Sequence, residues 1–238
     1  MSNAAAHSHE ATGPNRYLQH HFQNLAQQTE ASTMGMWAFL AQEVMFFGGM
    51  FVSYSVYRYL YPHVWEQGSG HLPLMPGMIN TIVLLLSSFT MAMGVYYCQI
   101  GNNKRLVQML LCTLLLGFTF VGIKLQFEYF PKWEGGILPG AHWNPHGHYA
   151  DIAANPADQG PFQLFFFLYY LMTGMHAFHM LIGFAILFVL IYQAAFKKAY
   201  GPDRYVPIEY FGLYWHFVDI VWVFLFPLWY LVGNRGGH

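Results

Sequence analysis

Residues 214–233 read YWHFVDIVWVFLFPLWYLVG, an aromatic and aliphatic stretch that contains one histidine and one aspartate. A run of about 18 or more apolar residues is long enough to cross the hydrocarbon core of a bilayer as a helix. The stretch therefore predicts a membrane-spanning helix. It also raises the question of what Asp219 does in the middle of such a helix.

The composition of the whole chain also indicates a membrane protein. Of the 238 residues, 55% are hydrophobic and only 9% are charged, whereas soluble domains have about 25% charged residues. Four more apolar runs are long enough to span, and their continuous character favours helices over barrel strands. We predict an all-α polytopic fold, a bundle of five transmembrane helices at residues 35–59, 78–100, 106–127, 162–196 and 206–233.

The segments around these spans predict the domain organisation and the orientation. Residues 1–33 are expected to form a polar N-terminal tail, residues 34–233 the five-helix domain with an outer loop at about 128–160, and residues 234–238 a C-terminal tail. Short cytoplasmic loops carry an excess of basic residues. We therefore expect a cytoplasmic N-terminus and an outside C-terminus, because most Lys and Arg residues then lie on the cytoplasmic side: Arg16, Lys104, Arg105, Lys197, Lys198 and Arg204.

Histidines outside the spans could either bind a metal or simply be exposed to solvent. Three lie in the outer loop and four in the tail, without the cysteine or carboxylate spacing of a zinc site. We expect exposed histidines there and no metal. Cys98 and Cys112 form no CxxC motif and are expected to be free thiols. The histidines concerned are His142, His146 and His148 in the loop and His7, His9, His20 and His21 in the tail.

Ionisable residues inside the predicted spans are the candidate functional residues. Each costs several kcal/mol in a membrane unless it has a partner, so each calls for an explanation. The predicted intramembrane polar network consists of Glu43, His176, His179, His216 and Asp219.

The spacing of these residues indicates which of them share a helix face. His176 and His179 are three residues apart, as are His216 and Asp219, so each pair lies on one face. Three histidines and two carboxylates could hold a metal or a haem, but no Glu-x-x-His motif occurs within a span. From spacing alone, internally hydrogen-bonded structure is favoured over metal binding.

Glycines on either side of the first histidine pair predict a helix contact. Gly174 precedes the pair and Gly183 follows it. Small residues let the backbones of membrane helices approach closely. We therefore expect this face to pack against protein. The sequence contains no Gly-rich phosphate loop, nucleophile elbow or basic nucleic-acid patch, so we expect no nucleic-acid partner.

Five motifs together resemble a known family. The chain is similar to subunit III of haem–copper terminal oxidases (the cytochrome c oxidase subunit 3 family), in its five-helix bacterial form. The combination of the fourth motif with the fifth is highly specific. The motifs are AQEVMFFGGMFVSY at 41–54, NTIVLLLSSFTM at 80–91, FVGIKLQFEY at 120–129, TGMHAFHMLIG at 173–183 and YWHFVDIVWVFLFPLWYLVG at 214–233.

The resemblance implies an accessory subunit of a proton-translocating respiratory oxidase in the bacterial inner membrane. Such a subunit binds no haem or copper, which belong to its partners. It packs mainly on subunit I, beside subunit II and a small subunit IV, stabilises subunit I and supports proton uptake. Glu43 is the family's carboxylate near bound phospholipid, and Arg58 and Lys124 are candidate lipid headgroup contacts. No catalytic residue and no metal ligand is expected in this chain.

Several alternatives remain at this point. Cytochrome c is the preferred electron donor, and a quinol oxidase subunit of similar form is the first rival. A homologous subunit that accompanies nitric oxide reductase is the second. A stand-alone membrane haem or metal protein is the third. For Glu43 we predict a hydrogen bond to His179 or His216.

Overall fold

The computed structural model describes residues 22–140, 143–197, 199–202 and 204–233, and most of these residues are helical. Five of the described helices are long and apolar enough to cross a membrane. The predicted all-α fold with five transmembrane helices is therefore confirmed. The elements are α1 (Leu25–Leu60), α2 (Pro62–Gly70), α3 (Leu74–Gln99), α4 (Asn103–Lys124), the π-helix η2 (Leu125–Tyr129), α5 (Phe130–Glu134), the 3-10 helix η3 (Gly147–Ala153), α6 (Gln159–Phe196) and α7 (Val206–Tyr230).

The chain divides into two compact units, residues 1–43 and residues 44–238. In the first unit, α1 begins at Leu25, well before the predicted start of the span at residue 35. The last part of the expected polar tail is therefore helical. The rest of α1, from Val44 onwards, belongs to the second unit.

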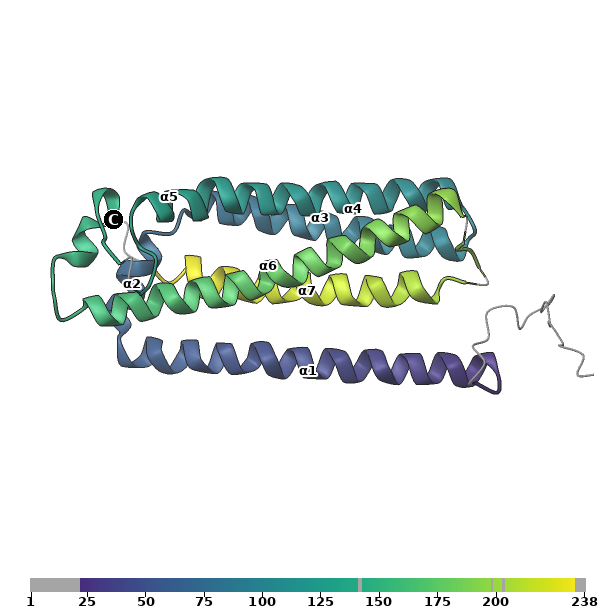
Figure 1. The fold of residues 1–238 in the computed structure, drawn as a ribbon, viewed down its shortest axis with the longest axis horizontal. Coiled ribbons are helices and arrows are strands. Elements are labelled where there is room, and N and C mark those ends of the chain that lie inside the picture. The colour runs from purple at the N-terminus through teal and green to yellow at the C-terminus, as the bar shows by residue number, and fades with distance from the viewer. Residues whose placement is uncertain (1–21, 141–142, 198, 203, 234–238) are drawn as a thin grey trace, which may run out of the picture. The chain divides into compact units, whose positions relative to one another are not determined.

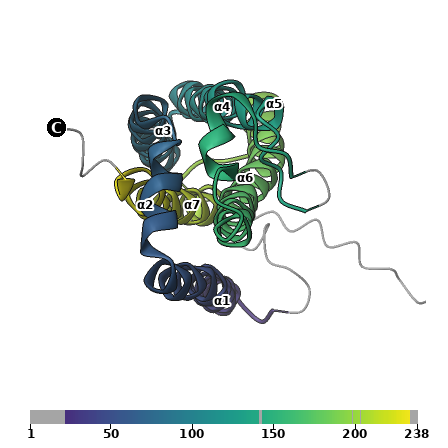
Figure 2. The same ribbon diagram turned by 90° about the vertical axis from the view of Figure 1, so that its left-hand side faces the viewer.

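In the second unit, α3, α4, α6 and α7 form a four-helix bundle. Helix α3 contacts α4 and α7, and α6 contacts the same two helices, so each helix has two neighbours. Figures 1 and 2 show the four helices side by side, with the short α2 crossing one end of the bundle. Pro62 stands at the start of α2, a position where its missing N–H costs no helical hydrogen bond. This short helix was not among the elements predicted from the sequence.

Aromatic side chains fill the end of the bundle near α2. Trp65, Phe165 and Trp229 are all buried. Their rings meet edge to face, with centroids 5.2 Å apart for Trp65 and Phe165 and 5.1 Å apart for Phe165 and Trp229. Edge-to-face contacts of this kind add stabilisation beyond the buried area. The packing fastens α2 to α6 and α7.

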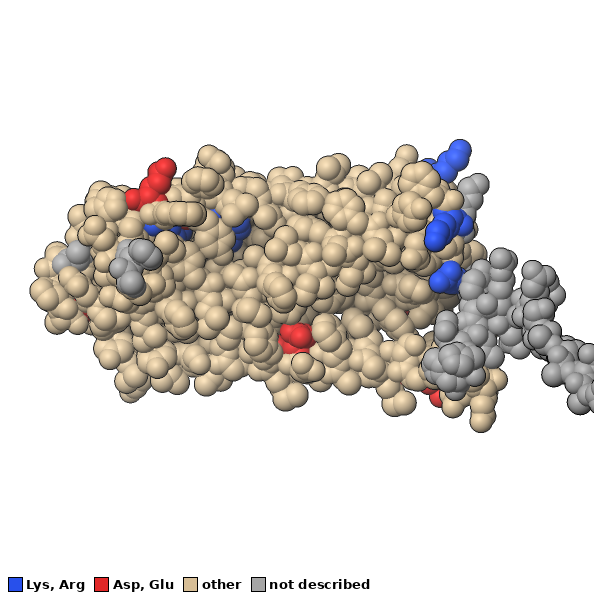
Figure 3. Space-filling model, viewed as in Figure 1, with Lys and Arg blue, Asp and Glu red and all other residues tan. Residues whose placement is uncertain are grey.

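The surface between the ends of the second unit is apolar. On the face seen in Figure 3, Lys and Arg side chains lie near the ends and the long middle stretch has almost none.

The third membrane-spanning helix runs from Asn103 to Glu134, because η2 and α5 continue α4. The loop expected from residue 128 therefore begins later than predicted. This extension brings Glu128 and Lys132 into the helical bundle.

Candidate functional site

One face of α7 is hydrogen-bonded to α3. Tryptophan and histidine side chains of α7 meet serine and threonine hydroxyls of α3, which gives these side chains hydrogen-bond partners. Three hydrogen bonds join the helices: Trp215 Nε1 donates to Ser87 Oγ at 2.7 Å, Ser88 Oγ and His216 Nδ1 lie 2.6 Å apart, and Trp222 Nε1 donates to Thr81 Oγ1 at 3.2 Å. The stripe that carries His216 therefore packs within the chain.

Asp219 is buried on the same helix but is poorly paired. Only 3% of the residue is exposed, and neither carboxyl oxygen has a hydrogen-bond partner among the described residues. The Ser88 hydroxyl lies nearby, and it is also close to His216. A buried carboxyl without a good partner destabilises the fold, by about 1–3 kcal/mol.

This environment predicts the effect of removing the carboxyl. Asp219→Leu is expected to leave assembly intact and to raise the free energy of unfolding by up to about 2 kcal/mol, because an unpaired polar group is replaced by an apolar one. Asp219→Asn should change stability little. The thermal stability of the purified complex measures both effects. A loss of assembly in the leucine variant alone would mean that the carboxyl has a partner in the complex.

The two histidines of α6 lie in different surroundings. His176 is 1% exposed, and its ring contacts Phe120 and Trp222 with centroids 5.6 and 5.3 Å away. His179 has its Nδ1 2.8 Å from the carbonyl oxygen of Met175, one turn earlier. The described residues contain no group of three or more His, Cys, Asp or Glu side chains that could hold a metal ion.

Glu43 ends the first compact unit, whereas the histidines belong to the second. Its predicted hydrogen bond to His179 or His216 therefore stays a prediction. The structure does bring His216 and Asp219 to the interface of α3 and α7, and it places His176 next to Trp222 of α7. Four of the five residues thus lie on α6 and α7 within the second unit, and the network as a whole stays a prediction.

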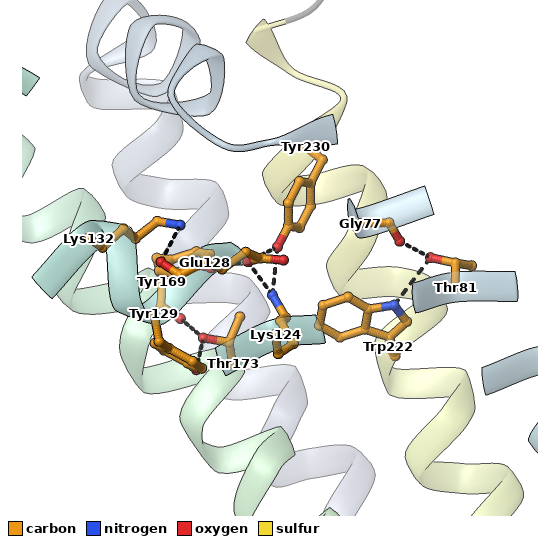
Figure 4. A network of polar contacts seen from close by, with 10 residues as sticks. All are labelled: Gly77, Thr81, Lys124, Glu128, Tyr129, Lys132, Tyr169, Thr173, Trp222 and Tyr230. Atoms are coloured by element: carbon orange, nitrogen blue, oxygen red, sulfur yellow. Dashed lines mark hydrogen bonds and ion pairs between the residues drawn. The ribbon is translucent and has the colours of Figure 1, made fainter. Parts of the chain in front are cut away.

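The described residues also contain a buried ion cluster, which consists of Lys124, Glu128 and Lys132. Their exposed fractions are 5%, 0% and 1%. The Nζ of Lys124 lies 2.5 Å from Oε2 of Glu128. The Nζ of Lys132 donates to the carbonyl oxygen of Glu128 at 3.3 Å. Figure 4 shows the cluster between α4, α6 and α7.

Tyrosines complete the shell around the Glu128 carboxylate. Tyr169 of α6 and Tyr230 of α7 both donate hydrogen bonds to its Oε2. The Nζ of Lys132 lies 4.8 Å from the centre of the Tyr169 ring. Lys124 Nζ lies similarly over Trp222, at 4.4 Å from the ring centre. Aromatic faces stabilise cations that have left water.

The three charged residues of the ion cluster lie along one extended helix. Lys124, Glu128 and Lys132 are four residues apart in sequence, which places them on one helix face. The π-helix η2 lies between the two lysines and contains Glu128. Single π-turns inside helices often mark functional sites.

This cluster was not predicted from the sequence, because the predicted span ended at residue 127. The regular spacing of lysine, glutamate and lysine was a signal that the helix continues. The ammonium group of Lys124 is directed to Glu128 and Tyr230 inside the bundle. Its expected contact with a lipid headgroup stays a prediction. The headgroup contact of Arg58 stays a prediction.

Two histidine–aspartate pairs tie α2 to the segment that precedes α6. His63 Nε2 lies 3.1 Å from Asp158 Oδ1, and His71 Nε2 lies 3.0 Å from Asp151 Oδ2. Burial acts to raise the pKa of Asp151, but a hydrogen bond from Gln67 and the neighbouring His71 outweigh it, so its pKa is lowered.

The two histidines of the predicted outer loop that lie among the described residues contact nearby residues. His146 Nδ1 lies 2.7 Å from the carbonyl oxygen of Asn144. The ring of His148 meets that of His71 edge to face, with centroids 5.1 Å apart. Tail histidines 7, 9, 20 and 21 and loop histidine 142 lie outside the described residues.

The fold and the buried site define a class: a multipass helical membrane protein with an ion cluster buried inside its helical bundle. Comparison with known proteins agrees with this. The family model described as cytochrome c oxidase subunit III matches residues 160–234. The chain is 29% identical over 206 residues to the probable quinol oxidase subunit 3 of Staphylococcus aureus (strain USA300), covering 86% of this chain and 90% of the relative.

A second relative is the probable quinol oxidase subunit 3 of Staphylococcus saprophyticus subsp. saprophyticus. It is 24% identical over 201 residues, which cover 84% of this chain and 88% of the relative. Together with the family model, these matches confirm the resemblance found in the sequence. The chain is therefore similar to subunit III of the haem–copper oxidases, in the family model and in both relatives.

Proposed function

We propose that this chain is a non-catalytic accessory subunit of a bacterial respiratory haem–copper oxidase. It packs mainly on the catalytic subunit I, with subunit II and a small subunit IV in the same complex, stabilises subunit I and supports proton uptake. It lies in the cell inner membrane with its N-terminus in the cytoplasm and binds phospholipid. Haem and copper belong to the partner subunits.

The second unit has paired charges in its interior and apolar side chains on its surface, and this contrast supports the proposal. Inside, the ion cluster and its tyrosines pair with one another. Outside, large apolar side chains of α3 and α4 are exposed, such as Phe89 at 63% and Leu115 at 65%. A membrane subunit whose charges are paired internally, with apolar outer faces, suits packing against lipid and another apolar subunit.

Purification from native membranes tests this role. A tagged form of the chain is expected to copurify with a larger subunit that contains haem and copper. The chain separated from its partners should retain neither haem nor metal in stoichiometric amounts. Recovery of the chain as a stable, haem-containing monomer would contradict the proposal.

The electron donor has two candidates. The sequence resemblance favours cytochrome c, and a proton-translocating cytochrome c oxidase is our first proposal. A quinol oxidase is the second, and the names of both relatives support it. The purified complex should oxidise one donor and not the other, and that turnover decides between them. Reduction of nitric oxide in place of oxygen would instead favour the reductase alternative.

A further inference from the structure

Two connections that are far apart in sequence meet at one end of the bundle, on the right in Figure 1. They are the turn between α3 and α4 and the loop between α6 and α7. Asn103 Nδ2 donates to the carbonyl oxygen of Ala194 at 2.9 Å. A Cβ atom on Gly101 would lie 3.4 Å from Pro202 Cδ. The side chains that flank these contacts are therefore held together at this end.

This end of the bundle is basic. Figure 3 shows Lys and Arg side chains gathered there. Within residues 96–105 and 192–210, Glu209 is the one acidic residue among the described positions. The described basic residues of the same two segments, which we call the basic end, are Lys104, Arg105, Lys197 and Arg204.

Three of these basic residues have charge available for a partner outside the chain. Lys104, Arg105 and Lys197 are exposed, and none of the ion pairs formed among the described residues involves them. Lys124, by contrast, is paired with Glu128 inside the bundle.

Tyrosine rings lie beside three of the four basic side chains. A cation over an aromatic face is stabilised there and is held in fewer orientations. Its remaining N–H groups still point outwards as donors for an anion. The distances from the charged group to the ring centre are 5.3 Å for Arg105 and Tyr97, 5.9 Å for Lys197 and Tyr192, and 5.7 Å for Arg204 and Tyr200.

Large apolar side chains are exposed next to the basic ones. Phe196, which precedes Lys197, is 78% exposed, and Ile100 at the end of α3 is 54% exposed. Two membrane-spanning helices begin and end here, at Asn103 and Phe196. The basic end therefore lies at the level where hydrocarbon gives way to headgroups. A ligand that meets both kinds of surface has an anionic head and an apolar tail.

We propose that the basic end binds the phosphate headgroup of an anionic phospholipid. The phosphate oxygens accept hydrogen bonds from the ammonium and guanidinium groups, and the acyl chains lie along the exposed apolar side chains. Basic residues that flank membrane helices bind anionic headgroups in this way. The inference deepens the phospholipid binding of the proposed function, at residues other than Glu43 and Arg58.

Lipid binding to the purified complex tests this site. The complex is stripped of lipid in a neutral detergent and titrated with dioleoylphosphatidylglycerol or with dioleoylphosphatidylcholine. Native mass spectrometry then counts the lipid that stays on this chain. The wild type should prefer phosphatidylglycerol by about tenfold or more, since each basic residue near the headgroup strengthens binding about fivefold.

Charge variants locate the preference. Combined Lys104→Gln, Arg105→Gln and Lys197→Gln should remove it and leave phosphatidylcholine binding unchanged. Combined Lys104→Arg and Lys197→Arg keeps the charges and should keep the preference. Arg58→Gln, in the last turn of α1, is the control for a cation elsewhere and should also keep it. Raising the salt concentration should weaken the preference of the wild type, because ions screen exposed charges.

Each outcome bears on the lipid site. Equal binding of the two lipids by the wild type, an unchanged preference in the triple variant, or a loss caused by Arg58→Gln alone would overturn the proposal. Displacement of the lipid by an equal concentration of inorganic phosphate would also overturn it, in favour of a site for free anions. So would release of the triple variant from its partners without any phospholipid present, because an acidic partner protein then occupies the basic end.

Single variants cover the case in which the triple variant does not assemble. Lys104→Gln and Lys197→Gln should each reduce the preference about fivefold, and no reduction in either would contradict the site. The oxidase role is tested separately by copurification with the haem-containing subunit. A failure of the lipid site is therefore distinguishable from a failure of the proposed function.

Discussion

Replacing Glu128 with leucine is expected to prevent the chain from accumulating in the assembled complex. Lys124 and Lys132 are both buried. The Glu128 carboxylate contacts Lys124 and is the opposite charge that acts on Lys132, whose ammonium group donates to the backbone carbonyl oxygen of Glu128. Its removal leaves two buried ammonium groups without a counter-charge. Breaking a buried ion pair from one side costs about 3–5 kcal/mol, which is a large part of the stability of an ordinary domain.

Three further variants separate the effect of charge from that of shape. Glu128→Gln keeps an oxygen that accepts hydrogen bonds from Tyr169 and Tyr230, so less of the chain should be lost from the complex than with leucine. Lys124→Met combined with Glu128→Leu removes the closest ion pair as a unit, and its loss should be less than the sum of the two single losses. Glu134→Leu, at an exposed glutamate of α5, should have little effect.

The amount of the chain recovered with its partners, measured by quantitative blotting of the purified complex, tests these expectations. Full recovery of the Glu128→Leu variant would show that the lysines do not depend on this carboxylate. In that case a partner subunit or a lipid would have to supply the counter-charge.

Replacing Gly183 with a larger residue is expected to have the second largest effect. A Cβ atom at this position would lie 2.8 Å from a ring carbon of Trp215, closer than real contacts allow. Trp215 cannot easily move away, because it is fully buried and its Nε1 donates to Ser87. Gly183→Ala should lower the free energy of unfolding by about 1–3 kcal/mol, and Gly183→Leu should abolish assembly.

Gly174 provides the matched control on the same helix. No atom lies within 4 Å of the Cβ that an alanine would add there. Gly174→Ala should therefore be neutral or stabilising by up to about 1 kcal/mol, because alanine is the better helix former. Thermal unfolding of both alanine variants measures the difference. Equal effects would mean that α6 and α7 do not approach at Gly183 as closely as described.

The contrast between the two glycines illustrates what a sequence can and cannot predict about packing. Both were expected to admit a neighbouring helix. Gly183 does so, since Trp215 and Tyr214 of α7 lie against it, whereas Gly174 has open space at its Cβ. A small residue permits a close approach, but which helix crosses at that level depends on the arrangement of the whole bundle.

The ion cluster was missed for a similar reason. Hydropathy ends a span at the first charged residues, since a single charge is costly in the membrane. Glu128 and Lys132 were therefore assigned to a loop. Their charges are compatible with the interior because Lys124, Tyr169 and Tyr230 surround Glu128, and two of these three residues come from other helices. No local pattern shows that such partners will arrive.

The sequence by itself determined the fold class, the number of spans and the resemblance to a family. These follow from the length of the apolar runs and from local motifs, and both are properties of contiguous residues. Only the tertiary structure decided which polar groups meet: His216 with Ser88, and Lys124 with Glu128 and Tyr230. In the apolar interior the stability of a polar group depends on the partner it reaches, and helix packing brings that partner from a distant part of the chain.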